Sequence, residues 1–210
     1  MTGVLGAVIA CAVAAVIVRW VPRVALAAAQ RHVWWSLAPA ALLGAGAGLV
    51  GRHLGEQAAL AVVAGAAGVL VVVDLAEQRL PDSVVLPTLA LWLLAAVALA
   101  ASGSAPWSAL WGSVLGAALV FGGFLVAAFL ARGLLGFGDV KLSALLGAVL
   151  GWFGWASVGT GIVAGFLLHG LAALVVLVVT RDLRAEVAMG PALILGGVVG
   201  VASGTIGLPW

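Results

Sequence analysis

Residues 58–73 read AALAVVAGAAGVLVVV, carry no charge, and end at Asp74. The rest of the chain has the same character, because 65% of its 210 residues are hydrophobic and only 8% are charged. A soluble domain usually has about 25% charged residues, which cover its surface. The sequence therefore excludes a soluble enzyme, a nucleic-acid-binding protein and a disordered chain. It predicts an integral membrane protein, with the lipid bilayer as its partner.

Eight apolar, charge-free stretches are candidate membrane spans. A helix needs about 20 residues to cross a ~30 Å hydrocarbon core, and it satisfies its backbone groups within the segment. We therefore expect an all-α, polytopic protein in which residues 1–210 form one domain. Two longer stretches are divided at the turn-forming sequence Ser102–Pro106 and at the glycine-rich segment Gly151–Gly161. The expected spans lie near Val4–Val18, Trp34–Val50, Ala58–Val73, Leu86–Ala101, Ser108–Ala131, Leu142–Trp155, Ala156–Thr180 and Val187–Leu208.

The basic residues predict the orientation. With the N-terminus outside and eight spans, eight of the nine basic residues lie in cytoplasmic loops, and Arg52 alone lies outside. This asymmetry is a strong positive-inside pattern, and it supports the span count, because one missed span would destroy the alternation. Most acids fall on the same side, whereas Glu56 lies outside. The cytoplasmic basic residues are Arg19, Arg23, Arg31, Arg79, Arg132, Lys141, Arg181 and Arg184.

The remaining polar and aromatic residues suggest no bound metal and no cofactor. The single cysteine, Cys11, excludes an intrachain disulfide and a cysteine cluster. His169 lies inside an apolar span, where we expect a neutral side chain bonded to a neighbouring helix. Tyrosine is absent, so tryptophans must supply the interfacial anchors. The expected anchors are Trp34, Trp107, Trp111, Trp152 and Trp155.

Asp74 is the most informative acid in the sequence. It follows an apolar run at the cytoplasmic end of a span, where the negative end of the helix dipole opposes a carboxylate. Partial burial at the membrane interface adds to that cost. One interpretation is a solvated aspartate paired with Arg79. The other is a functional carboxyl that is kept there for its chemistry.

Asp139 lies between two glycines and an apolar run, in the sequence GFGDVKL. One interpretation is a helix N-cap. The other is a partner for Asp74 at the same membrane face, because two adjacent carboxyls share one proton and can divide the roles of base and acid. Asp82 follows Pro81 and is expected to cap the next helix. Lys141 either pairs with a carboxylate or extends to the interface.

Two segments resemble motifs of the type IV leader peptidases, also called prepilin peptidases. Residues 74–82 (DLAEQRLPD), followed by Leu86-Pro87, resemble the first motif, and residues 136–142 (GFGDVKL) resemble the second. Met189-Gly190-Pro191 resembles, more loosely, a late Phe-Gly-Pro segment. The resemblance implies that Asp74 and Asp139 are the catalytic pair. We expect Gly136, Gly138, Lys141, Pro81 and Asp82 to support them.

This resemblance implies removal of short basic leaders from prepilins or pseudopilins, after a glycine, at the cytoplasmic face. The chain is similar to the compact members, since it lacks the cysteine-rich cytosolic insert that follows the first span in larger bacterial members. Methylation of the new N-terminus is associated with that insert, so we do not expect methyltransferase activity.

Two other interpretations remain open on the residues alone. A presenilin-like intramembrane protease is suggested by Gly136-x-Gly138-Asp139 and by Pro191-Ala192-Leu193, although that class places its first aspartate inside a span. A polytopic transporter or scaffold would need acids near the bilayer midplane or broken helices facing each other. Here the acids gather at one membrane face instead.

Overall fold

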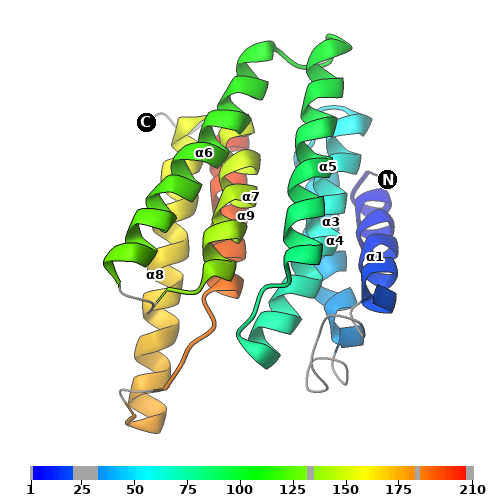
Figure 1. The fold of residues 1–210 in the computed structure, drawn as a ribbon. Helices are drawn as coiled ribbons and strands as arrows, with labels where there is room; N and C mark the ends of the chain where they lie inside the picture. Colours follow the sequence, from blue (N-terminus) through cyan, green and yellow to red (C-terminus); the bar gives the residue numbers. More distant parts are fainter. Residues whose placement is uncertain (1, 21–32, 132–134, 183–184, 207–210) are drawn as a thin grey trace.

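The computed structural model describes residues 2–20, 33–131, 135–182 and 185–206, and these residues form helices without a strand. Successive α-helices run in opposite directions (Figure 1), which brings segments distant in sequence side by side. The loop between the first two expected spans lies mostly outside the described residues. The elements are α1 (Thr2–Trp20), η2 (Val33–Ser36), α3 (Leu37–Val50), α4 (Leu54–Glu77), α5 (Asp82–Ala101), α6 (Trp107–Leu130), α7 (Phe137–Phe153), α8 (Trp155–Thr180) and α9 (Gly190–Ile206).

Five of these helices are long and apolar enough to cross a membrane: α1, α4, α5, α6 and α8. The apolar segments Trp34–Val50 and Gly190–Thr205 are shorter. The central helix α7 has 17 residues and is buried along most of its length. The chain is thus a multi-pass, all-helical membrane protein, as the composition predicted. The count of eight spans and the outside position of the N-terminus stay predictions.

The two divisions predicted within long apolar stretches are confirmed. Helix α5 ends at Ala101 and α6 begins at Trp107, on either side of the expected turn. Helices α7 and α8 meet at Gly154. Its backbone φ of 115° is one that residues with a side chain rarely adopt. Gly154 therefore reverses the chain direction in a single residue.

Small residues let the helices approach closely. Gly112 and Gly116 of α6 lie against Gly147 and Gly151 of α7, where an added Cβ would overlap the facing backbone. Close approach at small residues is a common mode of helix association in membranes. Helix α8 packs mainly on α9, and α1 packs on α3 and α4. Helices α5 and α9 each pack against both α4 and α7.

The tryptophans divide between the surface and the core. Four of the expected anchors are exposed, as an interfacial position requires: Trp34, Trp107, Trp111 and Trp155. The prediction for Trp152 was wrong, because its side chain is only 5% exposed. It lies edge-on to Trp92, with ring centroids 6.0 Å apart.

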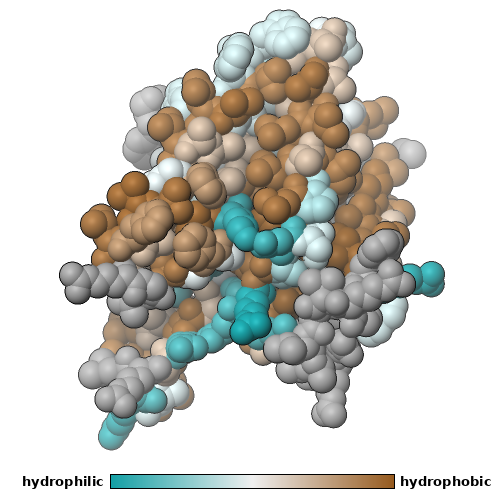
Figure 2. All heavy atoms as spheres, in the orientation of Figure 1, coloured by the Kyte–Doolittle hydropathy of each residue, from teal (hydrophilic) through white to brown (hydrophobic). Residues whose placement is uncertain are grey.

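Polar residues gather at one end of the molecule. The C-terminal end of α4 and the N-terminal ends of α5, α7 and α9 all lie toward the lower end of Figure 1. The space-filling view of the same face shows apolar residues over most of the helices and hydrophilic residues near that end (Figure 2). The antiparallel arrangement therefore brings the two predicted motifs to one face.

Candidate active site

Asp74 lies in the last turn of α4 and is 4% exposed. Its Oδ2 accepts a hydrogen bond of 2.9 Å from the backbone N–H of Gly190, the first residue of α9. The N-terminus of a helix presents free N–H groups and the positive end of its dipole, so it stabilises a carboxylate. This contact, rather than the alternative pairing with Arg79, satisfies Asp74 among the described residues.

Asp139 is the third residue of α7 and is partly buried. Its Oδ1 is buried and has no hydrogen-bond partner among the described residues. Asp139 precedes the predicted sixth span and lies outside the five candidate spans. Burial, and secondly the neighbouring carboxyl of Asp74, raise the pKa of Asp139 to about 6. The helix N-cap is Gly136, so the interpretation of Asp139 as an N-cap was wrong.

Two glycines of the second motif allow close contacts at this end. A Cβ on Gly138 would lie 3.0 Å from Cβ and 3.3 Å from the backbone N of Leu80, which precedes α5. A Cβ on Gly136 would lie 3.3 Å from Oδ2 of Asp139. The start of α7 therefore packs directly on the loop between α4 and α5.

Lys141 and Asp82 join the two motifs from α7 and α5. Their side chains form an ion pair, with 2.6 Å between Nζ and Oδ2 and exposures of 32% and 55%. The N-cap of α5 is Pro81, and Asp82 is the first helical residue, so the capping role predicted for Asp82 was wrong. Of the two interpretations of Lys141, pairing with a carboxylate is the one observed.

Gly190 is the contact of Asp74 that sequence reasoning did not assign. The sequence offered one signal, the loose resemblance of Met189-Gly190-Pro191 to a family segment, but it gave no contact. A Cβ on Gly190 would lie 2.7 Å from Oδ2 of Asp74, so glycine is required for this approach.

Other predicted polar residues lie elsewhere. His169 is on α8, and its Nδ1 is buried without a partner among the described residues, contrary to the bond we expected. Within the described part of the chain, no cluster of three or more His, Cys, Asp or Glu residues could hold a metal ion. The candidate site therefore consists of the carboxyls of Asp74 on α4 and Asp139 on α7. The backbone amide of Gly190 holds the first of them.

The comparison with protein families identifies the chain. The fold is that of a multi-pass helical membrane protein. The model of the type IV leader peptidase family matches residues 61–180, which is 120 of the 210 residues and includes Asp74 and Asp139. The chain therefore belongs to the type IV leader peptidase family. Neither the curated proteins nor the solved structures gave a match.

Proposed function

We propose that this chain is an aspartyl endopeptidase that removes leader peptides from prepilins or pseudopilins at the cytoplasmic face of the bacterial membrane. The observation that supports the proposal most is that Asp74 and Asp139 lie close enough to interact electrostatically. These two acids come from different motifs and different helices, yet the carboxyl of one raises the pKa of the other. Membership of the peptidase family supports the reaction class.

The proposed mechanism divides the two carboxyls into a base and an acid. Asp74 is assigned as the base, because its carboxyl accepts a hydrogen bond from the N–H of Gly190, whereas Oδ1 of Asp139 has no partner among the described residues. It takes a proton from a water molecule, whose oxygen attacks the scissile carbonyl carbon. Asp139 is the acid and gives its proton to the carbonyl oxygen, which forms a neutral tetrahedral intermediate. When the C–N bond breaks, Asp74 gives its proton to the leaving amine, and Asp139 takes a proton from a hydroxyl of the intermediate, which becomes the new carboxyl group. The pair then holds one proton on Asp139, as at the start.

Substitution of each carboxyl by its amide tests this mechanism. Asp74→Asn and Asp139→Asn keep the size of the side chain and remove the group that exchanges a proton. Glu186→Gln is the matched control, since Glu186 is exposed in the segment before α9. Co-expression with candidate prepilins from the same genome reports cleavage as a shift on a gel. We expect both aspartate variants to insert normally and to leave the leader in place, whereas the control cleaves as the wild type does.

Strong leader removal by either purified aspartate variant would refute the proposed pair. A wild-type chain that cleaves none of the candidate prepilins would instead refute the proposed substrate class.

The proposed orientation has a separate test. Gln78 and Gly136 are both exposed and belong to the two loops that the eight-span topology places in the cytoplasm. Single cysteines at these positions, on a Cys11→Ala background, should resist impermeant reagents added outside intact cells and react after the membrane is opened. Labelling of either cysteine from outside would exclude the topology.

A further inference from the structure

A second buried carboxyl lies at the opposite end of the bundle from Asp74. Glu56, near the start of α4, is 3% exposed. Its Oε1 accepts a hydrogen bond of 2.8 Å from Nε1 of Trp152, near the end of α7. Its Oε2 accepts another, also 2.8 Å, from the backbone N–H of Arg52. The proposed reaction uses neither the side chain of Glu56 nor that of Trp152.

This bond joins the same two helices that carry the carboxyl pair. Glu56 and Asp74 are 18 positions apart on α4, which is about 27 Å at 1.5 Å per residue. Asp139 and Trp152 are 13 positions apart on α7, which is about 20 Å. Side chains of α4 and α7 thus interact near both ends: by a hydrogen bond at the Glu56 end and electrostatically at the Asp74 end.

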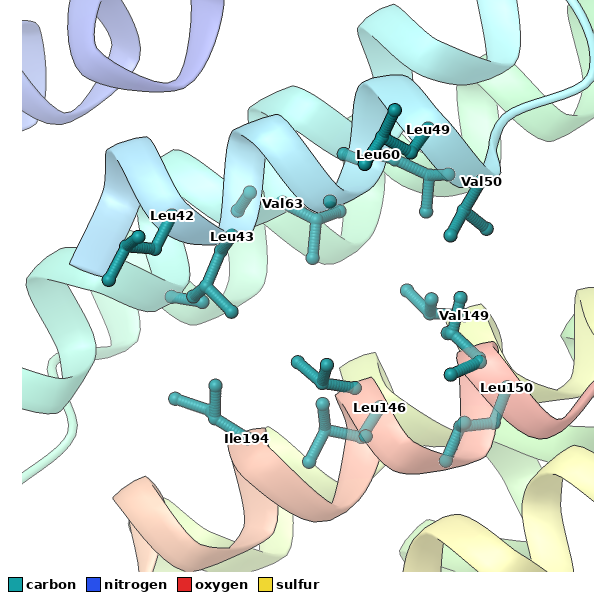
Figure 3. A pocket seen from close by; sticks show the side chains of 18 residues that line it. Leu42, Leu43, Leu49, Val50, Leu60, Val63, Leu146, Val149, Leu150 and Ile194 are labelled. Atoms are coloured by element: carbon teal, nitrogen blue, oxygen red, sulfur yellow. The ribbon is translucent and has the colours of Figure 1, made fainter. Parts of the chain in front are cut away.

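Between these two places an apolar cavity of about 320 Å³ separates the helices. Leucine and valine side chains of α3 and α4 face those of α7 and α9 across it (Figure 3). Leu60 and Val63 belong to the α4 side, and Leu146 and Val149 belong to the α7 side. Direct packing of α4 on α7 at mid-height therefore does not set their separation.

The ring of Trp152 packs against a buried, hydrogen-bonded tryptophan. Trp92 of α5 contacts its ring edge-on, with an angle of 81° between the ring planes. Nε1 of Trp92 in turn donates a 3.0 Å hydrogen bond to the hydroxyl of Ser113 on α6. Trp92 and Ser113 are both buried. The Glu56–Trp152 bond is thus part of a buried group that joins α4, α5, α6 and α7.

We propose that Glu56 and Trp152 are positioning residues: their hydrogen bond fixes α4 relative to α7 and thereby sets the separation of the Asp74 and Asp139 carboxyls. This inference rests on the proposed function for its effect on activity. It rests on the geometry alone for its effect on helix separation. A helix transmits a displacement at one end to the other, and a misplacement of about 1 Å at a reacting group can cost roughly 10²-fold in rate.

The test removes one hydrogen-bond donor, the N–H of Trp152, and measures two independent quantities. Trp152→Phe keeps an aromatic ring against Trp92 but deletes the N–H that donates the hydrogen bond to Glu56. Trp155→Phe is the matched control, since Trp155 lies at the same end and is 54% exposed. We expect Trp152→Phe to lower kcat for prepilin cleavage roughly 10- to 100-fold with little change in KM, and the control to match the wild type.

The second quantity is the distance between α4 and α7 at the carboxyl end. Leu75 and Phe137 are 65% and 61% exposed and flank the pair. Spin labels at these positions, on a Cys11→Ala background and without substrate, report the distance by electron paramagnetic resonance. We expect Trp152→Phe, unlike Trp155→Phe, to lengthen or broaden the distribution.

Glu56→Gln provides a second variant should the first fail to fold. Its amide oxygen can still accept from Trp152, so its kcat should stay closer to that of the wild type than that of Glu56→Leu. An unchanged kcat and an unchanged distance distribution in Trp152→Phe would overturn the proposal. If the wild type cleaves no prepilin, the proposed function fails. The distance measurement still decides whether the Glu56–Trp152 hydrogen bond positions α4 relative to α7.

Discussion

Replacement of Gly190 by alanine should displace the Asp74 carboxyl without removing any functional group. The added Cβ would lie 2.7 Å from Oδ2 and 3.2 Å from Cγ of Asp74, closer than carbon and oxygen atoms pack. Either α9 or the carboxyl must move, and the 2.9 Å hydrogen bond from the Gly190 amide is stretched or lost. A hydrogen bond to a charged group contributes about 1.5–3 kcal/mol. Because 1.36 kcal/mol corresponds to tenfold in rate, kcat/KM should fall roughly 10- to 100-fold.

Steady-state cleavage of a purified prepilin by the purified enzyme measures this loss. Gly170→Ala on α8 is the matched control, because no atom lies within 4 Å of the Cβ that it would add. It should leave kcat/KM unchanged and stabilise its helix by up to about 1 kcal/mol. A Gly190→Ala enzyme with kcat/KM within twofold of the wild type would show that the amide of Gly190 does not hold the reactive carboxyl.

Three further predictions concern pH, the ion pair and added reagents. The folded-state pKa of Asp139 is raised from 3.8 to about 6, so its proton is held more tightly in the folded chain. Its contribution to stability is therefore greatest below pH 3.8 and is lost as pH rises through about 6. If Asp139 is the acid, kcat/KM should also fall as pH rises through about 6. A flat profile from pH 5 to 8 would contradict that role. Lys141→Gln breaks an exposed pair with Asp82 and should cost less than about 1 kcal/mol of stability, measured by thermal unfolding in detergent. Chelators should leave cleavage unaffected, and loss of activity on chelation with rescue by added metal would contradict this expectation. Mass spectrometry should find no methyl group on the processed pilin after addition of S-adenosylmethionine. A mass increment of one methyl group that depends on this donor would contradict that expectation.

The sequence alone predicted the helices, and it singled out the two acids for which we propose the catalytic role. Charge-free stretches must form helices in a bilayer, since the backbone has no other way to satisfy its hydrogen bonds there. The turns at Ser102–Pro106 and within Gly151–Gly161 therefore stand where glycine, serine and proline interrupt apolar runs. Asp74 could be singled out because a carboxyl at the C-terminal end of an apolar helix is unfavourable, and Asp139 because it lies in a glycine-containing segment that resembles a family motif.

Local features near the helix ends were harder to predict. Asp82 and Asp139 both carry a side chain that suits an N-cap, yet Pro81 and Gly136 occupy those positions. The intrinsic preference for a cap is worth only about 1 kcal/mol, so tertiary contacts override it. Here Asp82 pairs with Lys141, and Asp139 lies beside Asp74.

Only the tertiary structure decided which faces of the helices meet. In water an apolar face marks the core, but in a membrane the packed face and the lipid-facing face are both apolar, so the pattern of hydrophobic residues does not distinguish them. For this reason the sequence assigned both Trp152 and Trp155 to the membrane interface. In the structure Trp155 is exposed, whereas Trp152 is buried and bonded to Glu56. For the same reason it did not identify the contact between Gly190 and Asp74, which depends on how α9 packs beside α4.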